Sequence, residues 1–171
     1  MTTVVFSHGQ ESGPWGTKIR ALADVARNKG LDVESIDYQG IADPRERVAK
    51  LLTEAARLEG PLLLVGSSMG GYVATAAAAD LEAAGLFVLA PAYFVEGFDA
   101  PPPEPPPLPI AIVHGWQDDV VPVDGSIRFA RSCSAALHIL DGDHRLTANI
   151  GEIGQLFGGF IDELGLGEKT S

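Results

Sequence analysis

The feature of this sequence that most restricts its fold is an alternation of short apolar runs with longer amphipathic stretches. Several runs are apolar at every position, which is typical of strands that helices cover on both faces of a sheet. The stretches between them have helical periodicity, and strands that alternate with helices indicate βαβ units. The sequence therefore predicts an α/β protein, a three-layer α/β/α sandwich with a mostly parallel sheet of about six strands. The runs assigned to strands are residues 3–7, 32–37, 62–66, 85–89, 110–114 and 136–140.

Four of the stretches between and after these runs carry helix signals. The first ends at Gly30, a residue type that tolerates the left-handed conformation found after helices. The second begins with Asp43 and Pro44, a capping residue followed by a proline in the first turn. The third, residues 73–79, consists mostly of small residues, and the fourth, residues 150–164, has an apolar stripe at helical spacing. We expect these helices to pack on the sheet.

The chain length of 171 residues favours a single domain over residues 1–171. Residues 101–109 contain seven of the twelve prolines, so this segment is expected to form neither a helix nor a central strand. We interpret it as a stiff proline-rich loop, and a ligand for an SH3-like partner is the alternative. Residues 165–171 are expected to form a flexible tail.

The charge balance and the cysteine content exclude several classes of partner. Twelve Lys and Arg against 23 Asp and Glu give a net charge of −11, whereas nucleic acids and anionic membranes bind basic surfaces. Cys133 is the only cysteine, which excludes an internal disulfide and a multi-cysteine zinc site. The first residues lack the pattern of a secretion signal, and no apolar run approaches the ~20 residues of a membrane span. We expect a soluble, cytoplasmic protein that binds neither nucleic acid nor membranes.

The strongest chemical motif is Gly66-Ser67-Ser68-Met69-Gly70, which fits the pattern G-x-S-x-G at the point where an apolar strand gives way to a helix. In this frame Ser68 is the candidate nucleophile. Flanking glycines permit the sharp turn that exposes the serine hydroxyl, and the backbone N–H of Met69 would face an oxyanion at the helix N-terminus. The alternative interpretation is a Gly/Ser turn before a packed helix.

A nucleophilic serine needs a base within hydrogen-bond reach, and the base needs a third group that fixes its tautomer. Two loops supply candidates for these roles. Residues 114–122 follow the fifth predicted strand and residues 141–146 follow the sixth. Because the carboxyl ends of parallel strands share one edge of the sheet, both loops are expected to lie on the side of Ser68, where open α/β sheets bind ligands.

Four motifs together resemble those of small bacterial α/β-hydrolases, in the family's chain order. They are Phe6-Ser7-His8-Gly9-Gln10, the Gly66 to Gly70 motif, the segment from His114 to Pro122, and Gly142-Asp143-His144. The resemblance implies Ser68 as nucleophile, Asp118 as acid and His144 as base. It also implies that the N–H of Gln10 is an oxyanion-hole donor beside that of Met69.

Two other carboxylates lie next to these residues. Asp119 is the rival of Asp118, and the spacing to the Val-Pro pair that follows favours Asp118. Asp143 is interpreted as a turn residue or helix cap, because its side chain cannot easily reach round to support the ring of its neighbour His144.

The sequence also departs from the family pattern. Residues 90–109, where a lid domain is usually inserted, are few and proline-rich, so we expect a capless version with an open site. The family often has two further strands before the His-Gly loop, and this sequence begins with the strand that leads into it. A serine at position 68 disfavours the chemistry of dehalogenase relatives, which use Asp, and of dienelactone hydrolase relatives, which use Cys.

No cofactor and no metal are expected. His8 and His114 are interpreted as loop imidazoles that bond to backbone, and His138 as a strand side chain, because the histidines lack paired ligand spacing. The loop over residues 9–18 resembles a phosphate-binding loop, but Thr17 precedes Lys18 where that motif requires Gly-Lys followed by Ser or Thr.

The sequence thus predicts a serine hydrolase that cleaves a carboxylic ester or related acyl bond of a small substrate through an acyl-enzyme on Ser68. The alternative is a non-catalytic protein of the same fold that binds a small molecule or a partner. Five aromatic residues in or beside the loops suggest a small apolar or aromatic acyl group. They are Trp15, Tyr72, Tyr93, Phe94 and Trp116.

Overall fold

The computed structural model describes residues 1–98 and 100–168 of the chain. Its sheet has six strands, all parallel, in the order β2-β1-β3-β4-β5-β6. All six predicted strands are present, and their ends differ from the predicted ends by at most one residue. The strands are β1 (Thr3–Ser7), β2 (Asp32–Ile36), β3 (Leu62–Ser67), β4 (Gly85–Leu89), β5 (Ile110–Gly115) and β6 (Ala136–Leu140).

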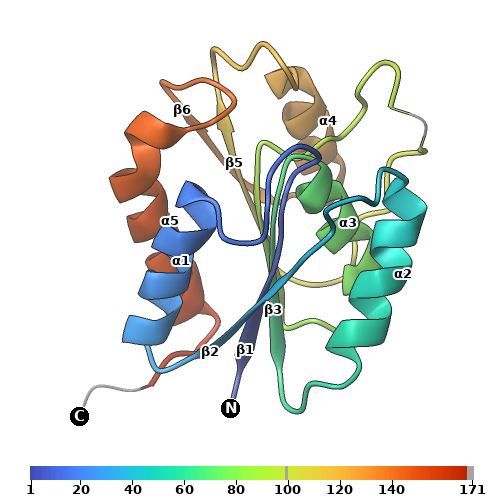
Figure 1. The fold of residues 1–171 in the computed structure, drawn as a ribbon. Coiled ribbons are helices and arrows are strands. Elements are labelled where there is room, and N and C mark those ends of the chain that lie inside the picture. Colours follow the sequence, from blue (N-terminus) through green and yellow to red (C-terminus); the bar gives the residue numbers. More distant parts are fainter. Residues whose placement is uncertain (99, 169–171) are drawn as a thin grey trace.

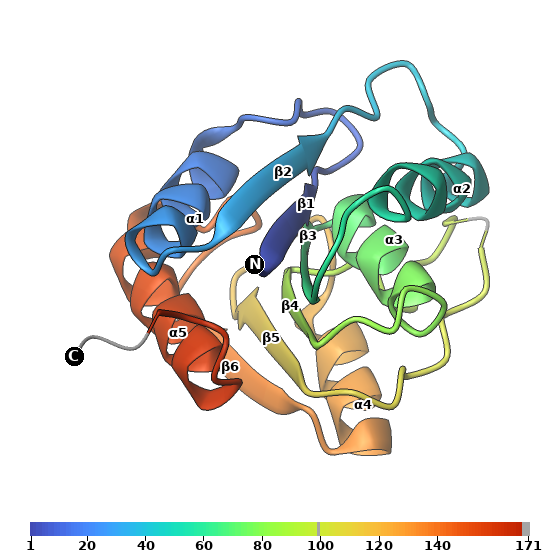
Figure 2. The ribbon, with the colours of Figure 1, turned by 90° about the horizontal axis from the view of Figure 1, so that it is seen from below.

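Helices cover both faces of the sheet and complete the predicted three-layer sandwich. Helices α1 (Thr17–Asn28) and α5 (Ile150–Glu163) lie on one face. Helices α2 (Pro44–Ala55), α3 (Met69–Ala78) and α4 (Val123–Cys133) lie on the other (Figures 1 and 2). A short 3-10 turn, Thr147–Asn149, precedes α5.

Each face of the sheet has its own apolar core. Alternate residues of a strand point to opposite faces, so Phe6 of β1 packs with Phe87 and Phe157 under α1 and α5, whereas Val5 packs under the other helices. The rings of Phe87 and Phe157 lie 5.0 Å apart. The four inner strands, β1, β3, β4 and β5, are buried along their whole length, which explains their continuous apolar sequence.

The helix boundaries follow from local chemistry. The carboxylate of Asp43 accepts a hydrogen bond from the N–H of Arg45 at 2.8 Å, and Pro44 opens α2, as the sequence predicts. Gly30 has a φ of 80° just after the end of α1. Helix α4 was not predicted. Its buried face contains Phe129 and Ala130 together with Gly125 and Ser126.

The chain path creates a crevice between β1 and β3. These strands are neighbours in the sheet, but β1 leads into α1 on one face and β3 leads into α3 on the other (Figure 2). The two connections therefore separate at the carboxyl ends of the strands. In open α/β sheets ligands bind at such a switch point.

The link between β4 and β5 contains no helix or strand among its described residues, 90–98 and 100–109. The Tyr72 hydroxyl donates a hydrogen bond to the carbonyl oxygen of Pro101 at 2.7 Å and ties the link to α3. No lid therefore stands over the sheet in this described segment.

After α5 the chain stays bonded to the body of the molecule. The N–H of Leu166 donates to the carbonyl of Ile161, and that of Glu168 donates to the carbonyl of Lys29. The remainder of the segment expected to be flexible, residues 169–171, lies outside the described residues. None of the described helices is both long and apolar enough to cross a membrane.

Candidate active site

Ser68 occupies a strained turn between β3 and α3. Its φ of 55° and ψ of −120° are rare for a residue with a side chain, and such strain persists only where the surroundings enforce it. Here the N–H of Ser68 donates to the carbonyl of Leu89, and its carbonyl accepts from the N–H of Ala92, both at 3.0 Å. Backbone bonds to the end of β4 and to the residues after it therefore hold the turn.

The glycines of the motif are required by close backbone contacts. A Cβ atom at Gly66 would overlap the carbonyl oxygen of Gly70, and a Cβ atom at Gly70 would overlap the carbonyl oxygen of Ser7. The backbone of the turn thus lies directly against the end of β1. At Gly9 a Cβ atom would stand 3.5 Å from the Cβ atom of Ser68, which places the loop after β1 beside the serine.

Asp118 and His144 form a partly buried pair. Nδ1 of His144 lies 2.7 Å from Oδ2 of Asp118, whose side chain is completely buried. The second carboxylate oxygen accepts the N–H groups of Val120 and Val121 at 2.9 and 2.8 Å. Because Nδ1 of His144 faces an acceptor, it carries the ring hydrogen, and Nε2 is left to accept a proton.

The rival carboxylates take no part in this pair. Asp119 is exposed, and its carboxylate has no hydrogen bond in the part of the chain that the structure describes. Asp143 accepts the N–H groups of Arg145 and Leu146, at 3.0 and 3.1 Å, and forms a turn as the sequence predicts.

A second histidine approaches the same carboxylate. His114 is fully buried, and its Nε2 lies 2.8 Å from the carbonyl oxygen of Val121 and 3.1 Å from Oδ2 of Asp118. Both are acceptors, so Nε2 carries the ring hydrogen and Nδ1 accepts from the Ser126 hydroxyl at 2.7 Å. Burial lowers the pKa of His114, an effect that the charge of Asp118 opposes.

Ser68 and His144 line one cavity of about 650 Å³ at the switch point. Gln10 and other residues of the loop after β1 form another part of its wall. Among the described residues no hydrogen bond joins the Ser68 hydroxyl to the His144 ring. The serine, the paired imidazole and one predicted oxyanion donor are therefore brought to a common space. The side chain of the other predicted donor residue, Met69, is buried, and its N–H lies at the start of α3.

The loop after β1 is held by a buried arginine of α2. Arg47 is 1% exposed, and its guanidinium donates to the carbonyl oxygens of His8 at 3.2 Å, Gly9 at 3.1 Å and Gln10 at 3.4 Å. Its Nε donates to the carbonyl of Ile41 at 2.7 Å. Burial lowers the pKa of Arg47. Among the described residues no carboxylate forms an ion pair with it.

His8 contributes a second bond to the same loop. Its Nε2 accepts the N–H of Tyr38 at 2.8 Å, so Nδ1 carries the hydrogen and donates to the Gly9 carbonyl at 2.7 Å. In a trans peptide the C=O and the following N–H point in opposite directions. Fixing the Gly9 carbonyl on Arg47 and His8 therefore fixes the direction of the Gln10 N–H away from them.

The model of the alpha/beta hydrolase family matches residues 4–160. The chain belongs to this family.

Individual relatives support the same assignment. The structure of a hydrolase of the alpha/beta superfamily from Xanthomonas campestris pv. campestris is 31% identical, with a TM-score of 0.87 over 94% of this chain and 98% of that chain. A serine hydrolase without lid from Xanthomonas campestris, XC6422, has a TM-score of 0.74 at 18% identity, over 99% and 84% of the two chains, a likeness of fold. Mouse (Mus musculus) palmitoyl-protein thioesterase ABHD10, mitochondrial, is 25% identical over 84% of this chain and 69% of its own length.

In this α/β hydrolase the expected aromatic pocket is absent from the cavity beside Ser68. None of the five aromatic residues is among the described residues that line it. Tyr72 and Tyr93 belong to the apolar core, whereas Trp15, Phe94 and Trp116 are exposed elsewhere on the surface. The position of an aromatic residue in a loop was thus a poor guide to the direction of its side chain.

Sequence reasoning also missed two basic residues of the hydrolase. Arg47 stands four and eight residues before Leu51 and Ala55, and this helical spacing could have placed it on the buried stripe of α2. Lys18, considered only within a phosphate-loop pattern, lines the cavity with Ser68. No group of three or more His, Cys, Asp or Glu side chains able to hold a metal ion occurs within residues 1–98 and 100–168.

Proposed function

We propose that this α/β hydrolase is a serine hydrolase that cleaves a carboxylic ester or related acyl bond of a small substrate through an acyl-enzyme on Ser68. The observation that carries the proposal is the Asp118–His144 pair, whose imidazole lines the same cavity as a serine held in a strained turn. A fixed carboxylate orients the imidazole and stabilises its protonated form, which is the role of the acid in a catalytic triad.

The reaction follows from the groups at the cavity. Nε2 of His144 accepts the proton of the Ser68 hydroxyl as Oγ attacks the carbonyl carbon of the substrate. The imidazolium then returns the proton to the leaving oxygen, and the acyl group stays on Oγ. Water repeats the attack and restores the serine. The Ser68–His144 hydrogen bond is expected to close when substrate binds, because catalytic hydrogen bonds are often loose in the free enzyme.

The oxyanion of the tetrahedral intermediate would be bound by two backbone groups, the N–H of Gln10 and the N–H of Met69. The first lies in the loop that Arg47 and His8 hold, and the second lies at the positive end of α3. In other enzymes the removal of one such donor costs roughly 3 to 4 kcal/mol of transition-state stabilisation.

Thioesters are a second candidate substrate class, favoured by the similarity to the mouse thioesterase. The same attack on the carbonyl carbon would expel a thiol in place of an alcohol. Turnover of p-nitrophenyl esters of rising chain length, compared with acyl thioesters of the same acyl groups, would separate the two classes.

Covalent labelling tests the proposal directly. A fluorophosphonate probe should add its mass to the peptide that contains Ser68, because an activated serine attacks the phosphorus. Ser68→Ala should abolish labelling and ester turnover and leave the fold intact. Ser67→Ala is the matched control, because it removes the neighbouring hydroxyl, at the first variable position of G-x-S-x-G, and it should retain most of the labelling.

Two carboxylate variants extend the same assay. Asp118→Asn should slow labelling by about a thousandfold, whereas Asp119→Asn should not slow it appreciably. Labelling at Ser67, or a folded protein that neither labels nor turns over any ester, would contradict the proposal. The latter result would favour the non-catalytic binding protein.

A further inference from the structure

The cavity beside Ser68 is lined by few apolar side chains. Among the described residues that line it, only Ile19 and Val120 contribute aliphatic side chains, and the others are glycines or polar residues. Long apolar acyl groups gain their binding energy from large aliphatic and aromatic side chains, of which this wall offers few. The lining therefore favours a small substrate that carries polar or charged groups.

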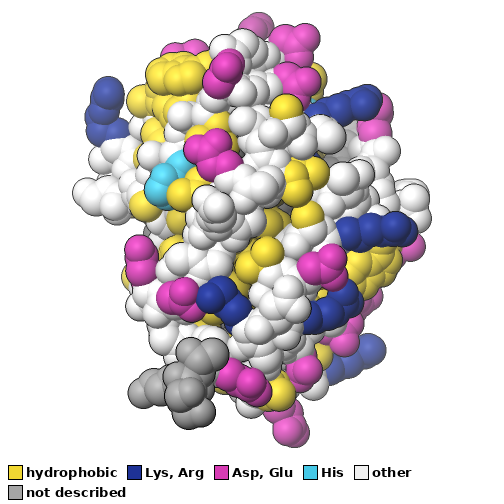
Figure 3. All heavy atoms as spheres, turned by 90° about the vertical axis from the view of Figure 1, so that its left-hand side faces the viewer, with side chains coloured by type: hydrophobic (Ala, Val, Ile, Leu, Met, Phe, Trp, Pro, Cys, Tyr) yellow, Lys and Arg dark blue, Asp and Glu magenta, His cyan; other side chains and the backbone are white. Residues whose placement is uncertain are grey.

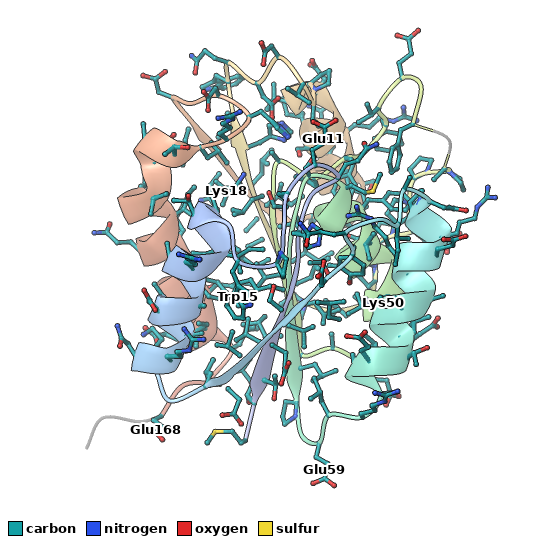
Figure 4. All side chains as sticks on the ribbon, in the orientation of Figure 1. Glu11, Trp15, Lys18, Lys50, Glu59 and Glu168 are labelled. Carbon is teal, nitrogen blue, oxygen red and sulfur yellow. The ribbon has the colours of Figure 1, made fainter. Side chains whose placement is uncertain are left out.

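The wall contains two basic side chains, Lys18 from the first turn of α1 and Arg145 from the loop after β6. Figure 4 shows Lys18 at the upper end of α1, beside the carboxyl edge of the sheet. Lys18 is half-buried and Arg145 is exposed. The acidic residue of the same wall, Glu11, is exposed in the loop after β1 (Figure 4).

Neither basic side chain has an ion-pair partner in the part of the chain that the structure describes. Burial lowers the pKa of Lys18, whereas the more distant charges of Asp118 and Asp143 act in the opposite direction. A partly desolvated ammonium without a close carboxylate is unfavourable, and an anionic ligand would relieve this cost.

The positive charges of Lys18 and Arg145 are opposite in sign to the net charge of the molecule. The chain has a net charge of −11, and acidic side chains are scattered over the face that carries α1 and α5 (Figure 3). An excess of basic over acidic side chains at the wall of the cavity is therefore not the average property of this surface. It marks the cavity as a place where a negative charge is favoured.

We propose that Lys18 and Arg145 form a subsite for a carboxylate on the substrate. The preferred substrates are then small anionic esters, such as half-esters of short dicarboxylic acids. The inference rests on the proposed function, because it places the reacting ester at Ser68 in the same cavity. It adds that Lys18 binds the charge by a charge-assisted hydrogen bond, with Arg145 at the mouth.

Kinetics with matched acyl groups test this subsite. The ratio of kcat/KM for p-nitrophenyl hemiglutarate to kcat/KM for p-nitrophenyl butyrate should fall at least about tenfold in Lys18→Met, and less in Arg145→Met. Arg20→Met is the control, because Arg20 is exposed on the same helix and does not line the cavity. An unchanged ratio in Lys18→Met would show that Lys18 does not bind a carboxylate on the acyl group.

The charge can reside on the acyl group or on the alcohol, and a second pair of esters separates the two. The ratio of kcat/KM for 4-carboxyphenyl acetate to that for phenyl acetate reports a carboxylate on the leaving group. A Lys18-dependent preference within either pair supports the subsite and assigns it to one side of the ester. If neither pair shows a preference that depends on Lys18, the proposed subsite is contradicted.

A binding measurement separates the subsite from the proposed catalysis. Ser68→Ala protein should bind glutarate in a calorimetric titration, and the double variant Ser68→Ala/Lys18→Met should bind it at least about tenfold more weakly. No glutarate binding to Ser68→Ala would contradict the subsite even if esters are hydrolysed. If glutarate binds in this way but Ser68 is never labelled, the proposed hydrolysis fails and the subsite stands.

Discussion

The turn at Ser68 depends on two residues that lack a side chain. Gly66 and Gly70 stand against backbone oxygens of Gly70 and Ser7, and no rotation of a side chain could relieve those overlaps. The serine is therefore placed by the backbone of its neighbours and not by contacts of its own hydroxyl.

Gly70→Ala tests this dependence. The added methyl group should force the turn and the end of β1 apart, lowering the free energy of unfolding by about 1 to 3 kcal/mol and slowing fluorophosphonate labelling. Gly151→Ala is the matched control, since both glycines are the second residue of a helix and nothing lies within 4 Å of a Cβ at Gly151. Urea unfolding should show Gly151→Ala unchanged or more stable, by up to about 1 kcal/mol. Equal effects of the two variants would contradict the steric argument.

At the residue scale, the sequence predicted those candidate site residues that lie within a short local motif. Ser68, Asp118 and His144 each follow a strand within a short recognisable pattern, and the structure brings the latter two into contact. Lys18 and Arg47 carry no such pattern. Helical spacing places Arg47 on the buried side of α2, but the partners that either long side chain meets across the fold are distant in the sequence.

At the scale of elements, α2 supports the loop after β1 although the two are distant in the sequence. Arg47 links them through three successive carbonyl groups, the first of which belongs to the buried residue His8. A helix on one face of the sheet thus determines the path of a loop at its edge.

Arg47→Met should release this loop. The loss removes the guanidinium donor from the carbonyl of the buried His8, and we expect the free energy of unfolding to fall by about 1 to 3 kcal/mol. If the Gln10 N–H binds the oxyanion as proposed, kcat should fall more than KM rises, because the donor acts in the transition state. Arg45→Met, an exposed change on the same helix, should leave both quantities unaltered. A variant of Arg47 that is destabilised but retains the wild-type kcat would show that the residue supports the fold alone.

The elements themselves were predictable to different degrees. The inner strands are apolar throughout because both of their faces are covered, so they can be predicted from their sequence. Helix α4 was not predicted, although its sequence is amphipathic and buries Phe129 and Ala130. The sequence does not show that Ser126, on the same buried face, is the hydrogen-bond donor of His114.

At the scale of the whole molecule, stability should depend on the buried histidine beside Asp118. Burial keeps the folded-state pKa of His114 below the ordinary value of about 6.5 that it regains on unfolding. Between these two values the unfolded chain binds a proton that the folded chain does not. The free energy of unfolding contributed by His114 is therefore present above about pH 6.5 and declines as the pH falls below it.

Urea unfolding at pH 7.5, 6.5 and 5.5 measures this slope. His114→Asn should reduce the loss of stability between pH 6.5 and 5.5, because the titrating group is gone. His138→Asn serves as the control, since His138 is only half-buried on the edge strand β6, and it should keep the wild-type slope. Identical slopes in wild type and His114→Asn would show that other groups govern the response to acid.

The order of the strands divides the proposed chemistry between the middle of the sheet and its margin. Ser68 and Gln10 follow β3 and β1, which have partners on both sides, whereas His144 follows β6, which has a partner on one side only. Peripheral strands open more readily than central ones. Transient detachment of β6 would withdraw the proposed base while the proposed nucleophile stays in place, so local opening at this edge would interrupt activity even while the inner strands remain folded.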